Sequence, residues 1–238
     1  MSSHNIVIGT RVNQARSPGS PGHAALALAV AECHIAPMQK IRTICVFCGS
    51  GPGTNPAFVE AAQAFGRIMA ENGIGLVYGG GSFGLMGAVA TAVLDHGGRV
   101  TGVIPEFLTD REKALRRAQE IIVTPDMHAR KQIMFERADA FVALPGGIGT
   151  LEETVEQMTW AQLGRHRKPI LLANIEGFWD PLCALLEHMK ELAFIRAGLT
   201  INLLVADSVG KILPKLEAAA PESPERETEL AAPTIERM

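Results

Sequence analysis

The chain has 238 residues, of which 47% are hydrophobic and 20% charged, so it can bury a substantial core. Its net charge of −3 argues against binding of nucleic acid through a basic surface. Four cysteines are too few for a disulfide scaffold of this size, which favours a reducing, cytoplasmic compartment. No apolar run reaches the length of a membrane span, so no membrane association is expected.

The two ends of the chain are predicted to lie outside the folded domain. Residues 1–40 are expected to be a flexible leader, in which the apolar run at 24–31 resembles part of a signal peptide but lacks a clean cleavage site. Met38 stands directly before the first predicted strand and is a candidate start of the folded unit. Residues 218–238 combine prolines with excess glutamate and are predicted to be a disordered acidic tail.

Apolar strands alternate with amphipathic helices through residues 41–217, the predicted domain. Strands are predicted at 43–48, 74–78, 99–104, 120–124, 138–144, 169–173 and 203–206. Helices are predicted at 56–72, 85–96, 127–137, 150–163, 180–192 and 209–216, with a partly helical loop at 106–117. This alternation predicts a single-domain α/β fold, a Rossmann-like doubly wound parallel sheet with helices on both faces.

Three predicted strands end in glycine-rich loops that open helices, at 49–53, 79–84 and 146–149. In a parallel sheet the three loops share the carboxyl edge, where ligands bind at the point at which strand order reverses. Glycine lets the backbone approach a ligand closely, and the amides of a helix N-terminus favour an anion. Any single loop could equally be a tight connection, but together they favour a phosphate-bearing ligand such as a nucleotide.

The middle loop also matches a dinucleotide fingerprint, because Gly79, Gly81 and Gly84 have G-x-G-x-x-G spacing and Glu106 follows near the end of the next strand. An NAD-binding interpretation remains open on spacing alone. It leaves the loop at 146–149 without a role, however, and a lone fingerprint is often a false match. The Gly-Lys-Ser/Thr of a P-loop follows none of the three loops.

Metal and cofactor signals are weak in this sequence. Cys45 and Cys48 have C-x-x-C spacing, but residues three apart on a strand point to opposite faces, which disfavours a redox or zinc role. Lys131 and Lys168 lie near plausible functional loops, but neither has a pyridoxal-phosphate context. No cofactor and no metal are therefore expected.

The most informative segment is Pro145–Glu153, which reads Pro-Gly-Gly-Ile-Gly-Thr-Leu-Glu-Glu. Thr150 and Glu153 have the spacing of a capping box, in which the glutamate would bond back to the Thr150 amide at a helix start. Alternatively, Thr150 and the glycine amides hold phosphate while Glu153 faces the pocket. The residues alone leave both interpretations open, whereas Glu152 points elsewhere on the helix and is predicted to be solvated.

A second polar cluster lies at 126–131. Arg130 and Lys131 are adjacent cations in the first turns of a predicted helix, where the helix dipole disfavours positive charge. This placement indicates that they serve a ligand anion, although solvated surface cations are the alternative. His128 is either a general base or a polar helix residue.

In chain order, Cys48-Gly49-Ser50, residues 79–87, Met127–Lys131 and Pro145–Glu153 resemble the motifs of the LONELY GUY family, the cytokinin riboside 5′-monophosphate phosphoribohydrolases. Members of this family have often been mislabelled as lysine decarboxylases. The resemblance extends from about residue 41 to residue 216. It departs from the family pattern at Gly51, where a second serine is usual, and between residues 105 and 120.

The resemblance implies a homodimeric or larger Rossmann-like enzyme without metal or redox cofactor, an AMP-nucleosidase-like hydrolase of cytokinin biosynthesis. It would cleave the N-glycosidic bond of AMP or an N6-modified AMP to free base and ribose 5-phosphate. The implied catalytic residues are Arg130 and Glu153. The alternative is a non-catalytic nucleotide or molybdenum-cofactor carrier on the same fold, which would not need that pair.

Substrate contacts are predicted from the glycine-rich loops and from the family resemblance. The glycine loops point to Gly49, Ser50, Gly81, Ser82 and Gly146. The resemblance adds Glu112, Arg130, Lys131, Gly147, Ile148, Gly149, Thr150, Glu153 and Thr159. Of these, Glu112 lies in the stretch that diverges from the family pattern.

Overall fold

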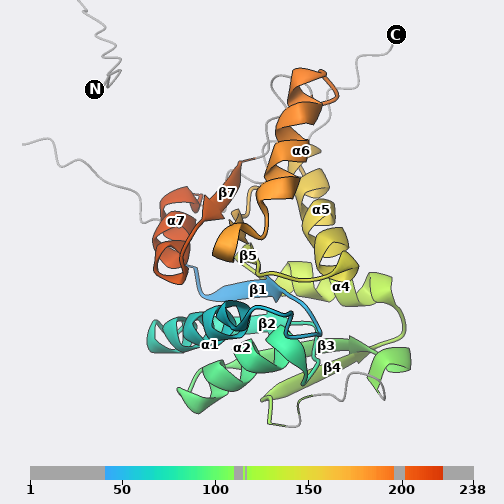
Figure 1. Ribbon diagram of the computed structural model, residues 1–238. Coiled ribbons are helices and arrows are strands. Elements are labelled where there is room, and N and C mark those ends of the chain that lie inside the picture. The colour runs from blue at the N-terminus through green and yellow to red at the C-terminus, as the bar shows by residue number, and fades with distance from the viewer. Residues whose placement is uncertain (1–40, 110–114, 116, 196–201, 222–238) are drawn as a thin grey trace, which may run out of the picture. The chain divides into compact units, whose positions relative to one another are not determined.

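The computed structural model describes residues 41–109, 115, 117–195 and 202–221, and the predicted leader and most of the predicted tail lie outside these residues. Seven strands form one sheet in the order β4-β3-β2-β1-β5-β6-β7, and every neighbouring pair is parallel (Figure 1). The strands are β1 (Thr43–Phe47), β2 (Gly75–Tyr78), β3 (Val100–Pro105), β4 (Glu120–Thr124), β5 (Ala140–Ala143), β6 (Ile170–Ala173) and β7 (Leu203–Ala206). The predicted doubly wound parallel sheet is confirmed.

The helices connect the strands as crossovers. They are α1 (Pro56–Glu71), α2 (Gly84–Asp95), α4 (Met127–Arg137), α5 (Ile148–Gln162), α6 (Asp180–Glu191) and α7 (Ile212–Ala219), with short 3-10 turns η1 (Glu106–Leu108), η2 (Ile175–Gly177) and η3 (Val209–Lys211). The last helix differs from its predicted range of 209–216, because its first three residues form η3 and the helix continues into the predicted tail. No helix among the described residues is both long and apolar enough to cross a membrane.

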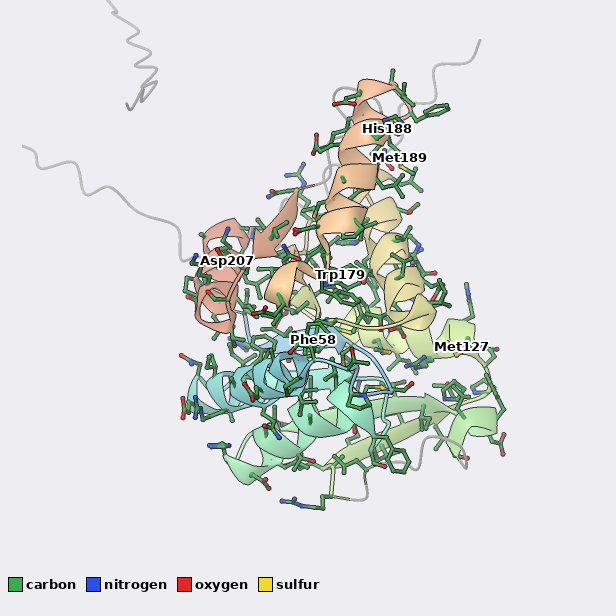
Figure 2. The ribbon with its side chains drawn as sticks, in the orientation of Figure 1. Phe58, Met127, Trp179, His188, Met189 and Asp207 are labelled. Atoms are coloured by element: carbon green, nitrogen blue, oxygen red, sulfur yellow. The ribbon has the colours of Figure 1, made fainter. Side chains whose placement is uncertain are left out.

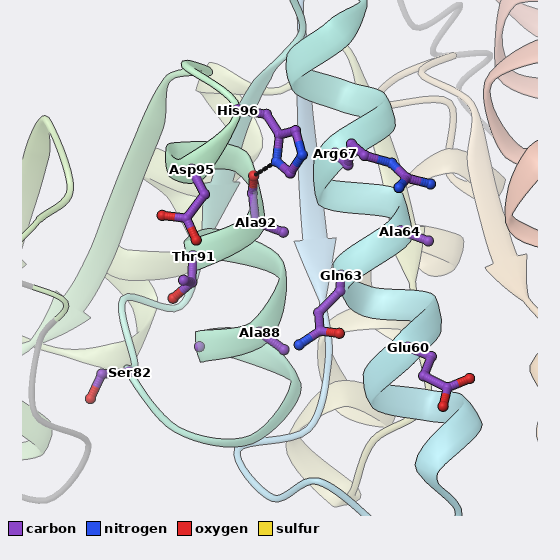
Figure 3. Close-up of a pocket in the computed structure, with 11 residues that line it drawn as sticks. Glu60, Gln63, Ala64, Arg67, Ser82, Ala88, Thr91, Ala92, Asp95 and His96 are labelled. Atoms are coloured by element: carbon purple, nitrogen blue, oxygen red, sulfur yellow. Dashed lines mark hydrogen bonds between the residues drawn. The ribbon is translucent and has the colours of Figure 1, made fainter.

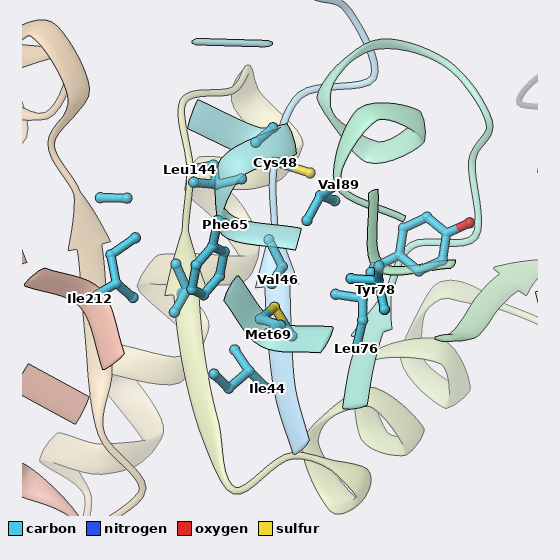
Figure 4. Packing of buried hydrophobic residues seen from close by; sticks show 14 of the residues in the cluster. Ile44, Val46, Cys48, Phe65, Met69, Leu76, Tyr78, Val89, Leu144 and Ile212 are labelled. Atoms are coloured by element: carbon cyan, nitrogen blue, oxygen red, sulfur yellow. The ribbon is translucent and has the colours of Figure 1, made fainter. Parts of the chain in front are cut away.

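Helices cover both faces of the sheet because strand side chains alternate. Ile44 and Val46 of β1 join a core with α1, α2 and α7, in which Phe65 of α1 is fully buried (Figure 4). Cys45 and Phe47 point the other way and pack with residues of α4 and α5. Burial on both faces explains why the strands are continuously apolar rather than alternating.

The prediction that Cys45 and Cys48 point to opposite faces of the sheet is confirmed. Cys45 and Cys48 belong to different core clusters on opposite faces, and both thiols are free.

One helix departs from this pattern of burial. Helix α6 has no buried residue, and its amphipathic sequence leaves Leu185 and Met189 partly open to solvent. Figure 2 shows His188 and Met189 near the outer end of this helix, away from the sheet. Near the start of the helix, Leu182 packs with Leu151 of α5 around Trp179, and one turn farther Leu186 packs against the core cluster that contains Met158 of α5.

The order of the strands reverses between β1 and β5, which places the topological switch point of the sheet there. The loop after β1 and the loop after β5 meet at this point, where the Gly49 amide donates to the Pro145 carbonyl at 3.1 Å. The loop after β2 lies beside them, since β2 pairs with β1. The prediction that the three glycine loops share one sheet edge is therefore confirmed.

Candidate functional site

Helix α5 opens directly onto the switch point. It begins at Ile148, with Gly147 as its N-cap and no side-chain capping bond. The capping-box interpretation, which made Thr150 the N-cap, is wrong, because Thr150 lies inside the first turn. The helix begins two residues earlier than predicted, and Gly146 packs against its first turn so tightly that a Cβ there would lie 2.1 Å from the Thr150 hydroxyl oxygen. The first amides of α5 are thus left without a side-chain cap.

A hollow of about 220 Å³ lies against this helix start. It is bounded by the ends of β1 and β2, the first turns of α2 and α5, and Arg130 from α4. Its lining residues are Val46, Cys48, Gly49, Ser50, Gly79, Met86, Arg130, Gly147, Ile148, Gly149, Thr150 and Glu153. The fold therefore gathers most of the predicted site residues from three separate motifs into one place.

Arg130 and Glu153 form an ion pair in this hollow. Their Nη1 and Oε1 atoms are 3.2 Å apart, and both residues are only 7% exposed. The Arg130 Nε also donates to the Val103 carbonyl at 3.1 Å, which fixes the guanidinium against β3. Two opposite charges this deeply buried are stabilised only by close pairing, so either group alone would be strongly disfavoured there.

Gly79 at the end of β2 makes room for the guanidinium. A Cβ at this position would lie 2.2 Å from the Arg130 Nη2 and 3.0 Å from the Met86 sulfur. The position therefore requires glycine for a reason other than its backbone angle, since only an absent side chain lets Arg130 reach Glu153.

Cys48 forms part of the wall beside these charges. Burial raises the pKa of its thiol, and the nearby Glu153 carboxylate raises it further, so the sulfur stays protonated. A protonated, buried thiol is a poor nucleophile, which leaves Cys48 as an apolar wall residue. Three lining residues that were not predicted as contacts, Cys48, Gly79 and Met86, nevertheless belong to the motifs that resemble the family. Val46 also lines the hollow, and its only signal in the sequence is its place near the end of a strand.

Lys131, the neighbour of Arg130, has a different environment. Its ammonium donates to the carboxylates of Glu152 and Glu156, the latter at 2.9 Å, and its side chain is 15% exposed. Although burial lowers the pKa of this ammonium, the hydrogen bonds to the two glutamates raise it above its usual value. Glu152, predicted to be solvated, is half-exposed but ion-paired. The positive charge of Lys131 is thus balanced within the chain.

Several predicted contacts lie outside the 220 Å³ hollow. Thr159 is exposed farther along α5 and donates its hydroxyl to the Val155 carbonyl. Gly81 is buried without lining the hollow, and His128 is exposed at the start of α4. Glu112 lies outside the described residues.

Two other predicted contacts line neighbouring hollows. Gly146 borders a hollow of about 310 Å³ that also shares Gly49, Ser50 and Gly147 with the site. Ser82 borders a hollow of about 590 Å³ that lies against α1 and α2 (Figure 3). The lining of that hollow includes neither Arg130 nor Glu153.

The helix start that follows the middle glycine loop is occupied by packing against the loop after β1. The amides of Leu85 and Met86, which open α2, donate to the Gly49 carbonyl at 3.0 and 3.3 Å. Gly84 has a φ of +57°, and a Cβ there would lie 2.3 Å from the Ser50 carbonyl oxygen. A dinucleotide site needs those helix amides for the pyrophosphate, so the bonds to Gly49 argue against the NAD-binding interpretation.

Comparison with known proteins identifies close relatives. Residues 86–216 match a family model described as "Possible lysine decarboxylase". The chain is 45% identical over 184 residues to the cytokinin riboside 5′-monophosphate phosphoribohydrolase LOG of Oryza sativa subsp. japonica, covering 77% of this chain and 76% of that protein. It is 44% identical over 201 residues to a similarly named enzyme of Arabidopsis thaliana, covering 84% of this chain and 92% of that protein.

Solved structures share the fold at lower identity. The molybdenum cofactor carrier protein of Chlamydomonas reinhardtii has a TM-score of 0.57 and 23% identity, covering 76% of this chain and 98% of its own. The molybdenum cofactor binding protein of Rippkaea orientalis has a TM-score of 0.56 and 21% identity, with the same coverage. At such identities the likeness establishes the arrangement of strands and helices alone.

Proposed function

Because the chain belongs to the LONELY GUY family of phosphoribohydrolases, we propose that it hydrolyses the N-glycosidic bond of a nucleoside 5′-monophosphate. The substrate is AMP or an N6-modified cytokinin riboside monophosphate, and the products are the free base and ribose 5-phosphate. The observation that carries this proposal is the buried Arg130–Glu153 pair, which lies beside the uncapped first turn of α5.

The first turn of α5 holds the 5′-phosphate in this proposal. The amides of Gly147–Thr150 face the hollow without a side-chain cap, and the helix dipole favours a dianion there. The buried Thr150 lies in the same turn and adds a hydroxyl donor. Phosphate binding at this point positions the reacting bond, which explains a preference for nucleotides over nucleosides. Lys131 and Thr159 remain proposed contacts on the family resemblance alone.

Glu153 and Arg130 act on the glycosidic bond. Cleavage of a ribosyl C–N bond passes through an oxocarbenium-like state, in which positive charge develops on the sugar. The Glu153 carboxylate stabilises that charge or orients the water that adds to the anomeric carbon. Arg130 fixes the substrate and assists departure of the base, which leaves with a proton.

The test is base release by the full chain from AMP and from isopentenyl-AMP. Glu153→Gln keeps the side-chain shape but removes the charge, so turnover should fall by about 10²- to 10⁴-fold while nucleotide binding by calorimetry persists. Glu152→Gln, the half-exposed neighbour, is the matched control and should keep wild-type turnover. Unchanged turnover in Glu153→Gln would refute the assignment of this carboxylate.

The second candidate is a nucleotide or molybdenum-cofactor carrier, which the structural likeness to carrier proteins brings forward. A carrier has no use for a buried carboxylate beside the bound ribose, so the Arg130–Glu153 pair favours the enzyme. Nucleotide binding without any base release by the wild-type protein would favour the carrier.

We also propose that the protein is a homodimer joined through α5 and α6. Large apolar side chains are exposed along these helices and just beyond α6, with Leu163 75%, Leu192 55% and Phe194 80% exposed. Such a concentration of apolar surface is typical of a protein interface. Light scattering should report a dimer that dissociates in Phe194→Ser but persists in Phe107→Ser, which changes an exposed phenylalanine elsewhere. A monomeric wild-type protein would contradict this interface.

We propose a cytoplasmic location for the protein and a catalytic domain that comprises residues 41–217. The buried thiols of Cys45 and Cys48 are free, which suits a reducing cytoplasm. The proposed catalytic residues all lie within residues 41–217, so a chain that starts at Met38 should retain base release. Loss of activity on removal of residues 1–37 would show that the leader contributes to the enzyme.

A further inference from the structure

Three arginines surround a hollow at the amino edge of the sheet, opposite the edge that carries the proposed site. Its volume is about 490 Å³. It is lined by Arg42, Thr43, Gly73, Gly75, Leu76, Val77, Arg99, Thr101, Glu120 and Arg137. Arg42 precedes β1, Arg99 precedes β3 and Arg137 ends α4, so three elements distant in sequence bring their cations to one place.

Within the part of the chain that the structure describes, two of these cations have no carboxylate at ion-pair distance. Arg42 and Arg99 make no ion pair with any residue that the structure describes. The single carboxylate of the lining, Glu120, already accepts bonds from the Arg137 guanidinium and from the Thr101 hydroxyl. The walls therefore carry an excess of positive charge on a protein whose net charge is −3.

Helix dipoles do not account for this arrangement. Arg137 occupies the last turn of α4, where a cation is favourable, but Arg42 and Arg99 belong to no helix. Arg42 is instead fixed at its backbone, since its amide and that of Thr43 donate to the Asp139 carboxylate at 2.8 and 2.9 Å. The Arg42 backbone is thus anchored while its guanidinium remains available.

The floor of the hollow is kept open by glycine. A Cβ at Gly75 would lie 3.7 Å from the Arg42 carbonyl oxygen, 3.7 Å from the Thr43 hydroxyl and 3.9 Å from the Arg99 carbonyl oxygen. A larger side chain at this position would therefore start between the backbones of Arg42 and Arg99 and take up part of the hollow that Gly75 lines.

We propose that this hollow is a second anion site, which binds a phosphate monoester between Arg42, Arg99 and Arg137. Guanidinium groups match phosphate oxygens through paired, charge-assisted hydrogen bonds. The volume lies within the range of small-molecule sites, about 300–1,000 Å³, and exceeds what inorganic phosphate alone would fill. The ligand class is therefore a small phosphorylated metabolite, and the site is independent of the proposed hydrolysis at the opposite edge.

The experiment is calorimetric titration of the full chain with inorganic phosphate and with glucose 6-phosphate. No nucleotide is added, because AMP is itself a phosphate monoester that would compete at this hollow and would be hydrolysed during the titration, so the variants below assign the site. Wild-type protein should bind glucose 6-phosphate saturably, one per chain, and more tightly than phosphate. Arg42→Gln and Arg99→Gln should each weaken binding by about ten- to hundredfold, because each removes a charged donor. Gly75→Val should weaken it by filling part of the hollow.

The matched control is Arg67→Gln, which removes an exposed arginine paired with Glu71 on α1 and should leave binding within about twofold. Thermal melts and turnover of AMP should be unchanged in Arg42→Gln and Arg99→Gln, which separates loss of the ligand from loss of the fold. The proposal is overturned if wild-type protein shows no saturable binding, if Arg99→Gln binds like wild type, or if Arg67→Gln weakens binding equally.

Discussion

Gly79 allows the Arg130 guanidinium to lie against the end of β2, and Gly79→Ala tests how closely catalysis depends on that position. The new Cβ would start 2.2 Å from the Arg130 Nη2, whereas non-bonded heavy atoms separate to about 3.5 Å. The guanidinium must therefore move by roughly 1 Å, away from its 3.2 Å contact with Glu153. A misplacement of about 1 Å can lower a rate about hundredfold.

The expected result is a fall of about hundredfold in kcat/KM for AMP, equivalent to about 2.7 kcal/mol of transition-state stabilisation. Overpacking should also lower the free energy of unfolding by about 1–3 kcal/mol, measured by urea denaturation. Gly75→Ala is the matched control on the same strand, since its nearest atoms lie 3.7 Å away and both quantities should stay near wild type. Wild-type kcat/KM in Gly79→Ala would refute the view that this contact positions Arg130.

Three further predictions concern stability. Burial lowers the pKa of His166 to about 4, below the roughly 6.5 of an unfolded chain, so stability is complete above about pH 6.5 and falls by on the order of 3 kcal/mol as the pH drops towards 4. Urea unfolding across this range should show that slope, and an equal slope in His166→Phe would contradict the assignment. Trp179→Phe removes a buried bond to the Ala143 carbonyl and should cost about 1–2 kcal/mol, so an unchanged unfolding midpoint would count against it. Asp139→Ala removes the acceptor of the two amides that open β1 and should cost about 2 kcal/mol in the same assay, whereas a loss below 0.5 kcal/mol (roughly the scatter of surface substitutions) would argue otherwise.

The order and type of the elements could be predicted from the sequence, because the signals for them are local. Apolar runs such as 140–143, which Pro145 soon follows, and 170–173, which Pro169 precedes, are typical of strands buried on both faces. Parallel crossovers then place the three glycine loops on one edge with no further information. The joint motifs around Arg130 and Glu153 also sufficed to indicate the family.

The contacts of those charged residues depend instead on packing between elements that are distant in sequence. The Thr-x-x-Glu spacing at 150–153 is the same whether Thr150 caps the helix or lies within it, and the folded backbone shows that the helix begins at Ile148 with Gly147 as its N-cap. Likewise, Arg130 and Lys131 are adjacent in sequence but form ion pairs with different carboxylates. Arg130 pairs with Glu153, whereas Lys131 pairs with Glu152 and Glu156.

The physical reason is that each partner lies on a helix about twenty residues away in sequence. The direction of a side chain around its helix, together with the strand that separates α4 from α5, selects the partner. Local sequence patterns do not specify this choice of partner. The Arg130–Glu153 ion pair could therefore be identified only from the folded structure.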